Sequence, residues 1–292
     1  MNRFDYLSPR NLAEALQMLS VRPEAIPLAG GTDILVQMKE RSRHIEALLS
    51  LKRVPELHQY SLNGTLTLGS ALTVGQIAAK QEIQRDYTAL AIGSGLIGSV
   101  QIRNMATLGG NLCNAAPSAD TAPPLLVLGA EVVIASHQGE RVVPLETFFL
   151  EPGRTILQPT ELVKEIVLSK SHTRTGSFYI RHTPRAGMDI AVVGVAAAIT
   201  LNTNEIILNA RLALGAAAPV PMRAVQAEAL LPGHRLTDEL LREVGKTASQ
   251  EAEPIDDLRA SAEYRRHLVN ILTQRALRGA MAKAKSNQGY QE

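Results

Sequence analysis

Two short stretches of this chain place adjacent glycines beside small polar residues, a pattern that can hold a charged ligand. The first is "LAGGTD" at 28–33, and the second is "TLGGN" at 107–111. A phosphate group is bound by several N–H donors that converge on it, and a side chain at that point would block the approach. Each such hydrogen bond to a charged group contributes about 1.5–3 kcal/mol. Two such loops therefore predict a diphosphate site that needs no lysine.

The aspartates near these stretches must do something other than bind phosphate. Asp33 and Asp120 only accept hydrogen bonds when ionised, so neither can face a phosphate oxygen. They can accept from sugar hydroxyls, or they can fix the loops by accepting from backbone N–H groups. N–H donors with carboxylates beside them fit a diphosphate that carries sugars better than a bare phosphate. The alternative interpretation is that both glycine pairs only form turns.

Other reactive residue types are scarce. Cys113 is the one cysteine, which excludes an intrachain disulfide and an iron–sulfur cluster held by this chain alone, since such a cluster takes about four thiolates. We interpret it as a small buried residue, because no neighbouring histidine or helix start is evident that would lower its pKa. The seven histidines show no spacing typical of metal ligands. The sequence therefore predicts no metal site and no catalytic acid–base group.

A third glycine-rich stretch, "GSGLIG" at 93–98, matches the G-x-G-x-x-G pattern of dinucleotide-binding folds. That pattern has meaning only where it follows a strand and opens a helix. The segment before it, "QEIQRDYTALAI", is instead typical of a helix. We therefore expect its small residues to let a helix pack closely.

Composition excludes several classes of function. The chain has 292 residues, a formal net charge of +2 and no tryptophan, so neither a basic surface nor a stacking platform for nucleic acid is indicated. The longest apolar stretch, 189–201, is shorter than the roughly 20 residues that span a bilayer. No apolar leader is evident at the start of the sequence. We expect a cytoplasmic protein without a transmembrane segment.

Periodicity predicts the elements that position the first loop and lead to the second. We expect a helix over 9–21 with Asn11 as its cap, strands over 25–30 and 44–51, a strand and a helix start over 64–77, and a helix over 87–102.

After the second loop we expect a turn and a buried strand over 122–136, and another strand over 161–169. Three apolar segments then predict the strands of an antiparallel meander, over 175–183, 189–201 and 205–218. Two helices are expected after them, over 237–249 and 261–284. The polar segment between Ser169 and Thr175 is the best candidate for a domain boundary.

The segments "LAGGTDILVQ" and "IRNMATLGGNLCNAAPSADTAPPLL" closely resemble the two flavin-diphosphate loops of the FAD-binding (medium) subunits of molybdenum hydroxylases. That family includes the medium subunits of carbon monoxide dehydrogenase and of bacterial xanthine dehydrogenases. "ELVKEIVL", "FYIRHTPRAGMDIAVVGVAAAI", "RLALGAAAPVPMRA" and "SAEYRRHLVNILTQRAL" resemble later segments of the same subunit in the same order. The resemblance therefore covers nearly the whole chain.

The resemblance implies an α+β fold. A two-lobed α/β FAD-binding domain of the vanillyl-alcohol-oxidase (PCMH) type would occupy residues 1–172, with a small lobe over about 1–57 and a larger lobe over about 58–172. A C-terminal domain with a three-stranded antiparallel sheet and a helical bundle would occupy residues 173–292.

The resemblance also implies which residues bind FAD. They are Leu28, Ala29, Gly30, Gly31, Thr32, Asp33, Ile34 and Leu35 in the first loop, Thr107, Leu108, Gly109, Gly110 and Asn111 in the second, and Ile97, Asp120, Val163 and Arg181 elsewhere. Asp120 would serve a flavin hydroxyl, and the backbone of Val163 would lie against the flavin. Arg181 stands where many relatives carry a lysine near the ring, and Ile97 stands where some carry an aromatic residue. Tyr179 packs either against the isoalloxazine or in the core.

The function that follows from the resemblance is that of an oxidoreductase subunit. A large partner subunit would oxidise the organic substrate at a molybdenum cofactor, and a small partner subunit would carry [2Fe–2S] clusters. Electrons would then reach FAD on this chain and pass to NAD⁺, a quinone or oxygen. Two alternatives remain: a self-sufficient FAD oxidoreductase with its substrate pocket in the C-terminal domain, and a scaffold subunit that has lost the flavin. Intact glycine pairs and both aspartates favour the flavin-binding subunit.

Overall fold

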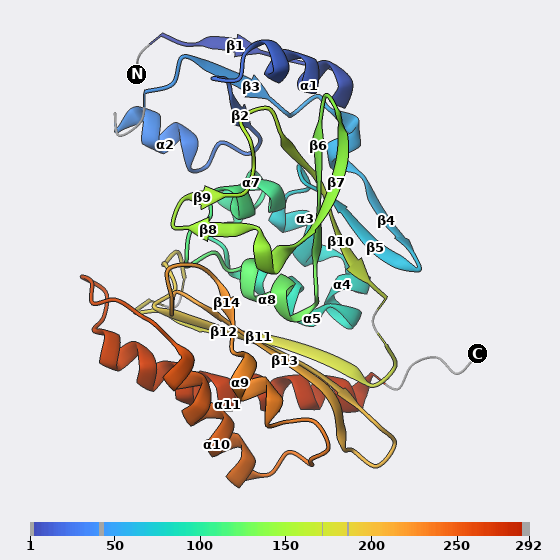
Figure 1. The fold of residues 1–292 in the computed structure, drawn as a ribbon, viewed down its shortest axis with the longest axis vertical. Helices are drawn as coiled ribbons and strands as arrows, with labels where there is room; N and C mark the ends of the chain where they lie inside the picture. The colour runs from blue at the N-terminus through green and yellow to red at the C-terminus, as the bar shows by residue number, and fades with distance from the viewer. Residues whose placement is uncertain (1–2, 41–43, 171, 186, 288–292) are drawn as a thin grey trace.

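Three main sheets, each accompanied by helices, follow one another along the longest axis of the molecule (Figure 1). The structure is a computed structural model and describes residues 3–40, 44–170, 172–185 and 187–287. The first sheet lies at the N-terminal end, the second in the middle and the third at the C-terminal end of this stack (Figure 1).

The first sheet has three parallel strands in the order β1-β3-β2. Its strands are β1 (Asp5–Leu7), β2 (Ile26–Leu28) and β3 (Ala47–Ser50), and its helical segments are α1 (Leu12–Val21), α2 (Ile34–Lys39) and η1 (Pro55–His58). The predicted cap of α1 is confirmed, since the Asn11 side chain accepts from the N–H of Glu14 at 2.8 Å. Leu12, Leu16 and Leu19 on the same helix are buried, as their spacing predicts.

The second sheet is antiparallel, with five strands in the order β4-β5-β10-β6-β7. Its strands are β4 (Tyr60–Asn63), β5 (Thr65–Gly69), β6 (Glu131–Ser136), β7 (Gly139–Pro144) and β10 (Leu162–Ser169). Six short helices lie between β5 and β6: α3 (Val74–Ala79), α4 (Gln81–Asp86), α5 (Thr88–Leu96), α6 (Val100–Arg103), α7 (Leu108–Cys113) and α8 (Ala122–Val127). A turn of 3-10 helix, η2 (Leu145–Thr147), and the hairpin β8 (Phe149–Glu151) and β9 (Arg154–Thr155) complete this part.

Two predicted elements of this part are wrong in detail. The segment expected as a turn is the helix α8, whose first turn accommodates Pro123 and Pro124 because N–H groups there have no intrahelical partner. The helix expected over 87–102 is two helices. α5 ends before Ile97, whose backbone is extended, and Ser99 caps α6.

The "GSGLIG" stretch lies inside and just after α5 instead of after a strand, so it is not a dinucleotide fingerprint. A side chain at Gly93 would overlap the carbonyl oxygen of Asp120. Its small residues therefore serve close packing, as expected.

The third sheet is antiparallel and has four strands, where the sequence predicted three. They are β11 (Thr175–His182), β12 (Val193–Leu201), β13 (Ile207–Gly215) and β14 (Met222–Arg223). The two residues of β14 are too few to produce an alternating pattern, which is why the sequence did not reveal them. The helices of this part are α9 (Val225–Ala229), α10 (Asp238–Glu251) and α11 (Ala262–Ser286).

Helices cover both faces of the third sheet. α11 lies against β11 and β12 on one face and packs on α10, whereas α5 and α8 of the middle part contact the same sheet from the other side (Figure 1). The core of the middle part accordingly includes Tyr179, Ala196 and Ala213 from this sheet. Within the described residues, no helix is long and apolar enough to cross a membrane.

We expect Gly176→Ala to destabilise the protein. The backbone of α11 lies directly on Gly176, so that a Cβ there would overlap the carbonyl oxygen of Ala280 and the amide nitrogen of Ala284. Overpacking of this kind reduces the free energy of unfolding by about 1–3 kcal/mol or more. Chemical denaturation measures the change. Gly95→Ala is the control, because its added methyl would meet only Ala78 at 3.8 Å and would favour helix; equal midpoints for the two variants would contradict the prediction.

Candidate flavin-binding site

The two glycine loops touch each other. A side chain at Gly30, in the loop between β2 and α2, would overlap the carbonyl oxygen of Met105, which leads into the second loop. Farther along, the Asn114 amide nitrogen lies 3.5 Å from a carboxylate oxygen of Asp33. Glycine at position 30 is thus required by contact between two parts of the chain, and this contact brings both predicted loops into one site.

The first loop presents a row of backbone donors. Gly31 has a φ of +76°, a conformation that suits glycine, and its carbonyl accepts from Leu35 N–H at 3.2 Å. The Asp33 carbonyl accepts the next N–H groups of α2. Within the described part of the chain, the N–H groups of Gly31, Thr32, Asp33 and Ile34 have no acceptor. Successive free N–H groups of this kind form an anion-binding concavity.

The second loop is built differently, and the expected role of Gly109 is corrected here. Gly109 is buried, its N–H donates to the carbonyl of Ser70 at 2.8 Å, and a side chain would meet the Ser70 Cβ at 2.6 Å. Its glycine is therefore required by packing against the β5–α3 connection. The N–H of Leu108 likewise donates within the chain, to Leu72 at 3.0 Å.

Donors in the second loop come from side chains. The Thr107 hydroxyl accepts from the N–H of Gly110 at 3.1 Å, which leaves its own proton to donate. The side-chain oxygen of Asn111 accepts from the Thr121 hydroxyl at 2.5 Å, and the side-chain nitrogen of Asn111 has no partner among the described residues. Gly110 is exposed, and a Cβ there would have only the Thr107 hydroxyl as a close neighbour, at 2.8 Å.

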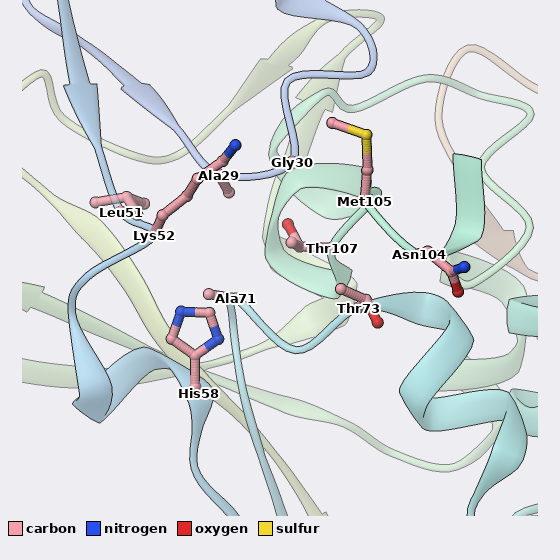
Figure 2. A pocket seen from close by; sticks show the side chains of 10 residues that line it. All are labelled: Ala29, Gly30, Leu51, Lys52, His58, Ala71, Thr73, Asn104, Met105 and Thr107. Atoms are coloured by element: carbon pink, nitrogen blue, oxygen red, sulfur yellow. The ribbon is translucent and has the colours of Figure 1, made fainter. Parts of the chain in front are cut away.

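A cleft of about 170 Å³ lies beside the contact between the loops (Figure 2). Three of the predicted residues line it: Ala29, Gly30 and Thr107. Seven further lining residues were not predicted from the sequence: Leu51, Lys52, His58, Ala71, Thr73, Asn104 and Met105. The missed residues come from the segments after β3, around the β5–α3 turn and after α6. No sequence pattern marks them, because only the tertiary fold brings them to the loops.

A second cluster of predicted residues is buried under the C-terminal sheet. Asp120 pairs with the Arg181 guanidinium and accepts from the Tyr179 hydroxyl at 2.7 Å. Arg181 also donates to the carbonyl of Leu96 at 2.9 Å, next to Ile97. The structure thus brings Asp120 and Arg181 into contact and ties Arg181 to the residue that precedes Ile97.

Tyr179 is 2% exposed and belongs to the core. Of its two predicted roles, the structure shows core packing.

Burial governs the ionisation of this cluster. It raises the pKa of Asp120 above its ordinary value, and the charge of Arg181 and the hydrogen bonds from Tyr179 and Arg181 oppose that rise. Burial and the neighbouring carboxylate raise the pKa of Tyr179 well above its usual range, so its hydroxyl stays protonated and donates. Burial also raises the pKa of the Cys113 thiol to about 12. A raised pKa favours the neutral thiol over the nucleophilic thiolate.

The remaining predicted residues frame the loops. Leu28 ends β2, and Ile34 and Leu35 begin α2. Val163 lies at an irregularity of β10, where the register to β6 shifts. The next carbonyl, that of Lys164, accepts from Ser70 N–H at 3.0 Å, and Ser70 in turn accepts from Gly109. This chain of hydrogen bonds holds β10 beside the second loop.

Residues 2–170 match the family described as the FAD binding domain in molybdopterin dehydrogenase. The chain belongs to this family. Residues 178–280 match a second description, the CO dehydrogenase flavoprotein C-terminal domain. The protein is thus an FAD-binding subunit of the xanthine and CO dehydrogenase type, as the resemblance implied.

Named relatives span the whole subunit. The chain is 35% identical to the xanthine dehydrogenase FAD-binding subunit of Escherichia coli O157:H7, over 96% of this chain and 98% of the relative. It is 33% identical to the glyceraldehyde dehydrogenase medium chain of Sulfolobus acidocaldarius, over 94% and 97%. The carbon monoxide dehydrogenase structure from Hydrogenophaga pseudoflava has a chain that superposes with a TM-score of 0.92 at 30% identity, over 97% of this chain and 98% of that one. This likeness confirms the predicted α+β fold class.

FAD is the cofactor of this family, and the residues of the subunit fit it. Four consecutive N–H groups without an acceptor in the described chain suit a diphosphate, and the adjacent cleft is lined by hydroxyl, amide, ammonium and imidazole groups without a carboxylate. That donor set suits an anionic, oxygen-rich ligand.

We expect Asp120→Asn to destabilise the subunit strongly. The side chains of Asp120 and Arg181 are 7% and 6% exposed, and removing the carboxylate charge leaves a buried guanidinium unpaired. Breaking such a pair reduces the free energy of unfolding by about 3–5 kcal/mol. Glu151→Gln removes one charge of the exposed pair Glu151–Arg154 and should cost less than about 1 kcal/mol. Urea unfolding of the two variants checks this, and a loss at Asp120 no larger than at Glu151 would contradict it.

Proposed function

We propose that this FAD-binding subunit receives electrons from [2Fe–2S] clusters of a small partner subunit and passes them to an external acceptor: NAD⁺, a quinone or oxygen. The observation that carries the proposal is a flavin site on a chain with a single cysteine, Cys113. Because a cluster takes about four thiolates, its ligands must come from another chain. The relatives' names, which describe an FAD-binding subunit and a medium chain, support a heteromeric assembly.

In this proposal the organic substrate is oxidised at a molybdenum cofactor on a large partner subunit. FAD supplies the redox chemistry on this chain, taking up electrons and releasing them to the acceptor. The residues of the chain bind and orient it. We also propose that residues 1–172 form the FAD-binding domain, with lobes over about 1–57 and 58–172, that residues 173–292 form the C-terminal domain, and that the complex works in the cytoplasm.

We assign the diphosphate to the first loop, where the N–H groups from Gly31 to Ile34 have no acceptor among the described residues. Thr107 and Asn111 add side-chain donors from the second loop. The Arg181 guanidinium donates to the carbonyl of Leu96, which places its positive charge near Ile97, and it forms an ion pair with Asp120. Ile97 and Val163 would border the flavin, as the resemblance implies.

Titration of the purified chain with FAD and with FMN, followed by flavin fluorescence, tests the assignment. FAD should bind more tightly than FMN by tenfold or more, about 1.4 kcal/mol, because only FAD carries the diphosphate. Gly110→Val should weaken FAD binding by a similar factor, since its side chain would project from the exposed face of the second loop. Thermal unfolding of the variant is the control. Equal affinities for the two flavins would argue against a diphosphate site here.

The isolated subunit should not oxidise the organic substrate of the complex. With FAD bound, anaerobic addition of xanthine, an aldehyde or CO should leave flavin absorbance unchanged, because the chain has no predicted site for that step. Addition of the two partner subunits should then allow the matching substrate to bleach the flavin. Bleaching by the subunit alone would instead favour a self-sufficient flavoenzyme.

A further inference from the structure

The cleft beside Gly30 contains two basic side chains that no feature of the two glycine loops predicted. Lys52 follows β3, and His58 ends η1, so both belong to the connection between the first and second sheets. In Figure 2, the His58 ring and the Thr107 hydroxyl are turned toward the space between the loops, and Lys52 extends along Ala29. The cleft thus combines a cation, an imidazole and a hydroxyl around the start of the first loop.

These groups are available to a ligand. Neither Lys52 nor His58 makes a hydrogen bond or an ion pair with any residue that the structure describes, in contrast to Lys164, which pairs with Glu140 at 2.9 Å. The Thr107 hydroxyl accepts from Gly110 and retains its own proton. None of the ten described residues that line the cleft is an aspartate or a glutamate. A cleft that offers hydrogen-bond donors and no carboxylate favours a ligand group with several anionic oxygens, such as a phosphate.

Volume and position narrow the choice of ligand group. At about 170 Å³ the cleft is smaller than the roughly 300–1,000 Å³ of whole-ligand pockets, so it takes one part of a larger molecule. Gly30 lines it, and the four N–H groups without an acceptor in the described part of the chain begin at the next residue. Anionic oxygens in the cleft would therefore adjoin the group bound by the first loop.

We propose that Lys52 and His58 bind the phosphate groups of FAD and complete the diphosphate site from the connection between the two lobes. This rests on the placement of the diphosphate at the first loop in the proposed function. Lys52 supplies the positive charge that the loops lack, and His58 supplies a ring N–H. The two side chains thereby favour FAD over flavins with a single phosphate.

Titrations of the wild-type chain and five variants with FAD and FMN test the proposal. Lys52→Met should raise the Kd for FAD about tenfold, as expected for a hydrogen bond to a charged group, and should affect FMN less. Arg53→Met is the matched control, because it removes the same charge one residue away and outside the cleft. His58→Leu should raise the Kd for FAD about fivefold. His137→Leu, in the β6–β7 turn, is its control.

Each outcome bears on a different claim. If Lys52→Met and His58→Leu bind FAD like the wild type, the proposal is overturned while the flavin site itself stands. If Arg53→Met weakens FAD as much as Lys52→Met, the effect is long-range charge and the proposal also fails. Recovery of FAD affinity in Lys52→Arg would support it and exclude a folding defect in Lys52→Met. If the wild-type chain binds neither flavin, it is the proposed function that fails.

Discussion

The close approach of two backbone segments at Gly30 and Met105 is the constraint on which the rest of the site depends. Only a glycine leaves room for the Met105 carbonyl at this point. This contact joins the small parallel sheet to the helices of the middle part. Gly30 and Thr107 line the same cleft, and the four N–H groups that follow Gly30 have no acceptor among the described residues. Gly30, the first residue of a glycine pair typical of ligand-binding loops, is thus required for packing against another segment of the chain.

The C-terminal sheet supplies two side chains to a buried cluster around Asp120 of the middle part. Tyr179 and Arg181, two residues apart on β11, both point to Asp120 in the connection between α7 and α8. Alternation along a strand puts such residues on one face, so a single strand delivers a hydroxyl and a cation to the same carboxylate. Arg223 of β14 also ties the sheet to the middle part, because it pairs with the buried Glu228 and with the exposed Glu146 of η2. These contacts fix the C-terminal sheet on the middle part of the molecule.

Much of this could be predicted from local pattern. Apolar residues recur at helical or strand spacing in several elements. These are the helix capped by Asn11, the strands on either side of the loops and the long strands of the third sheet. Two elements could not be predicted in this way. The strand β14 is only two residues long, and the helix α8 has prolines in its first turn. Lys52 and His58 lie in an exposed connection without any motif, and their place in the cleft follows only from tertiary structure. The hydrogen bond from the N–H of Gly109 could not be predicted for the same reason, since its acceptor Ser70 is distant in sequence.

A crystal structure of the FAD-bound chain would show whether the diphosphate lies between the two glycine loops. We expect phosphate oxygens within hydrogen-bond distance of N–H groups between Gly31 and Ile34, with the loop contact at Gly30 unchanged. Clear density for FAD with its diphosphate away from the first loop would show that this site is not the diphosphate site.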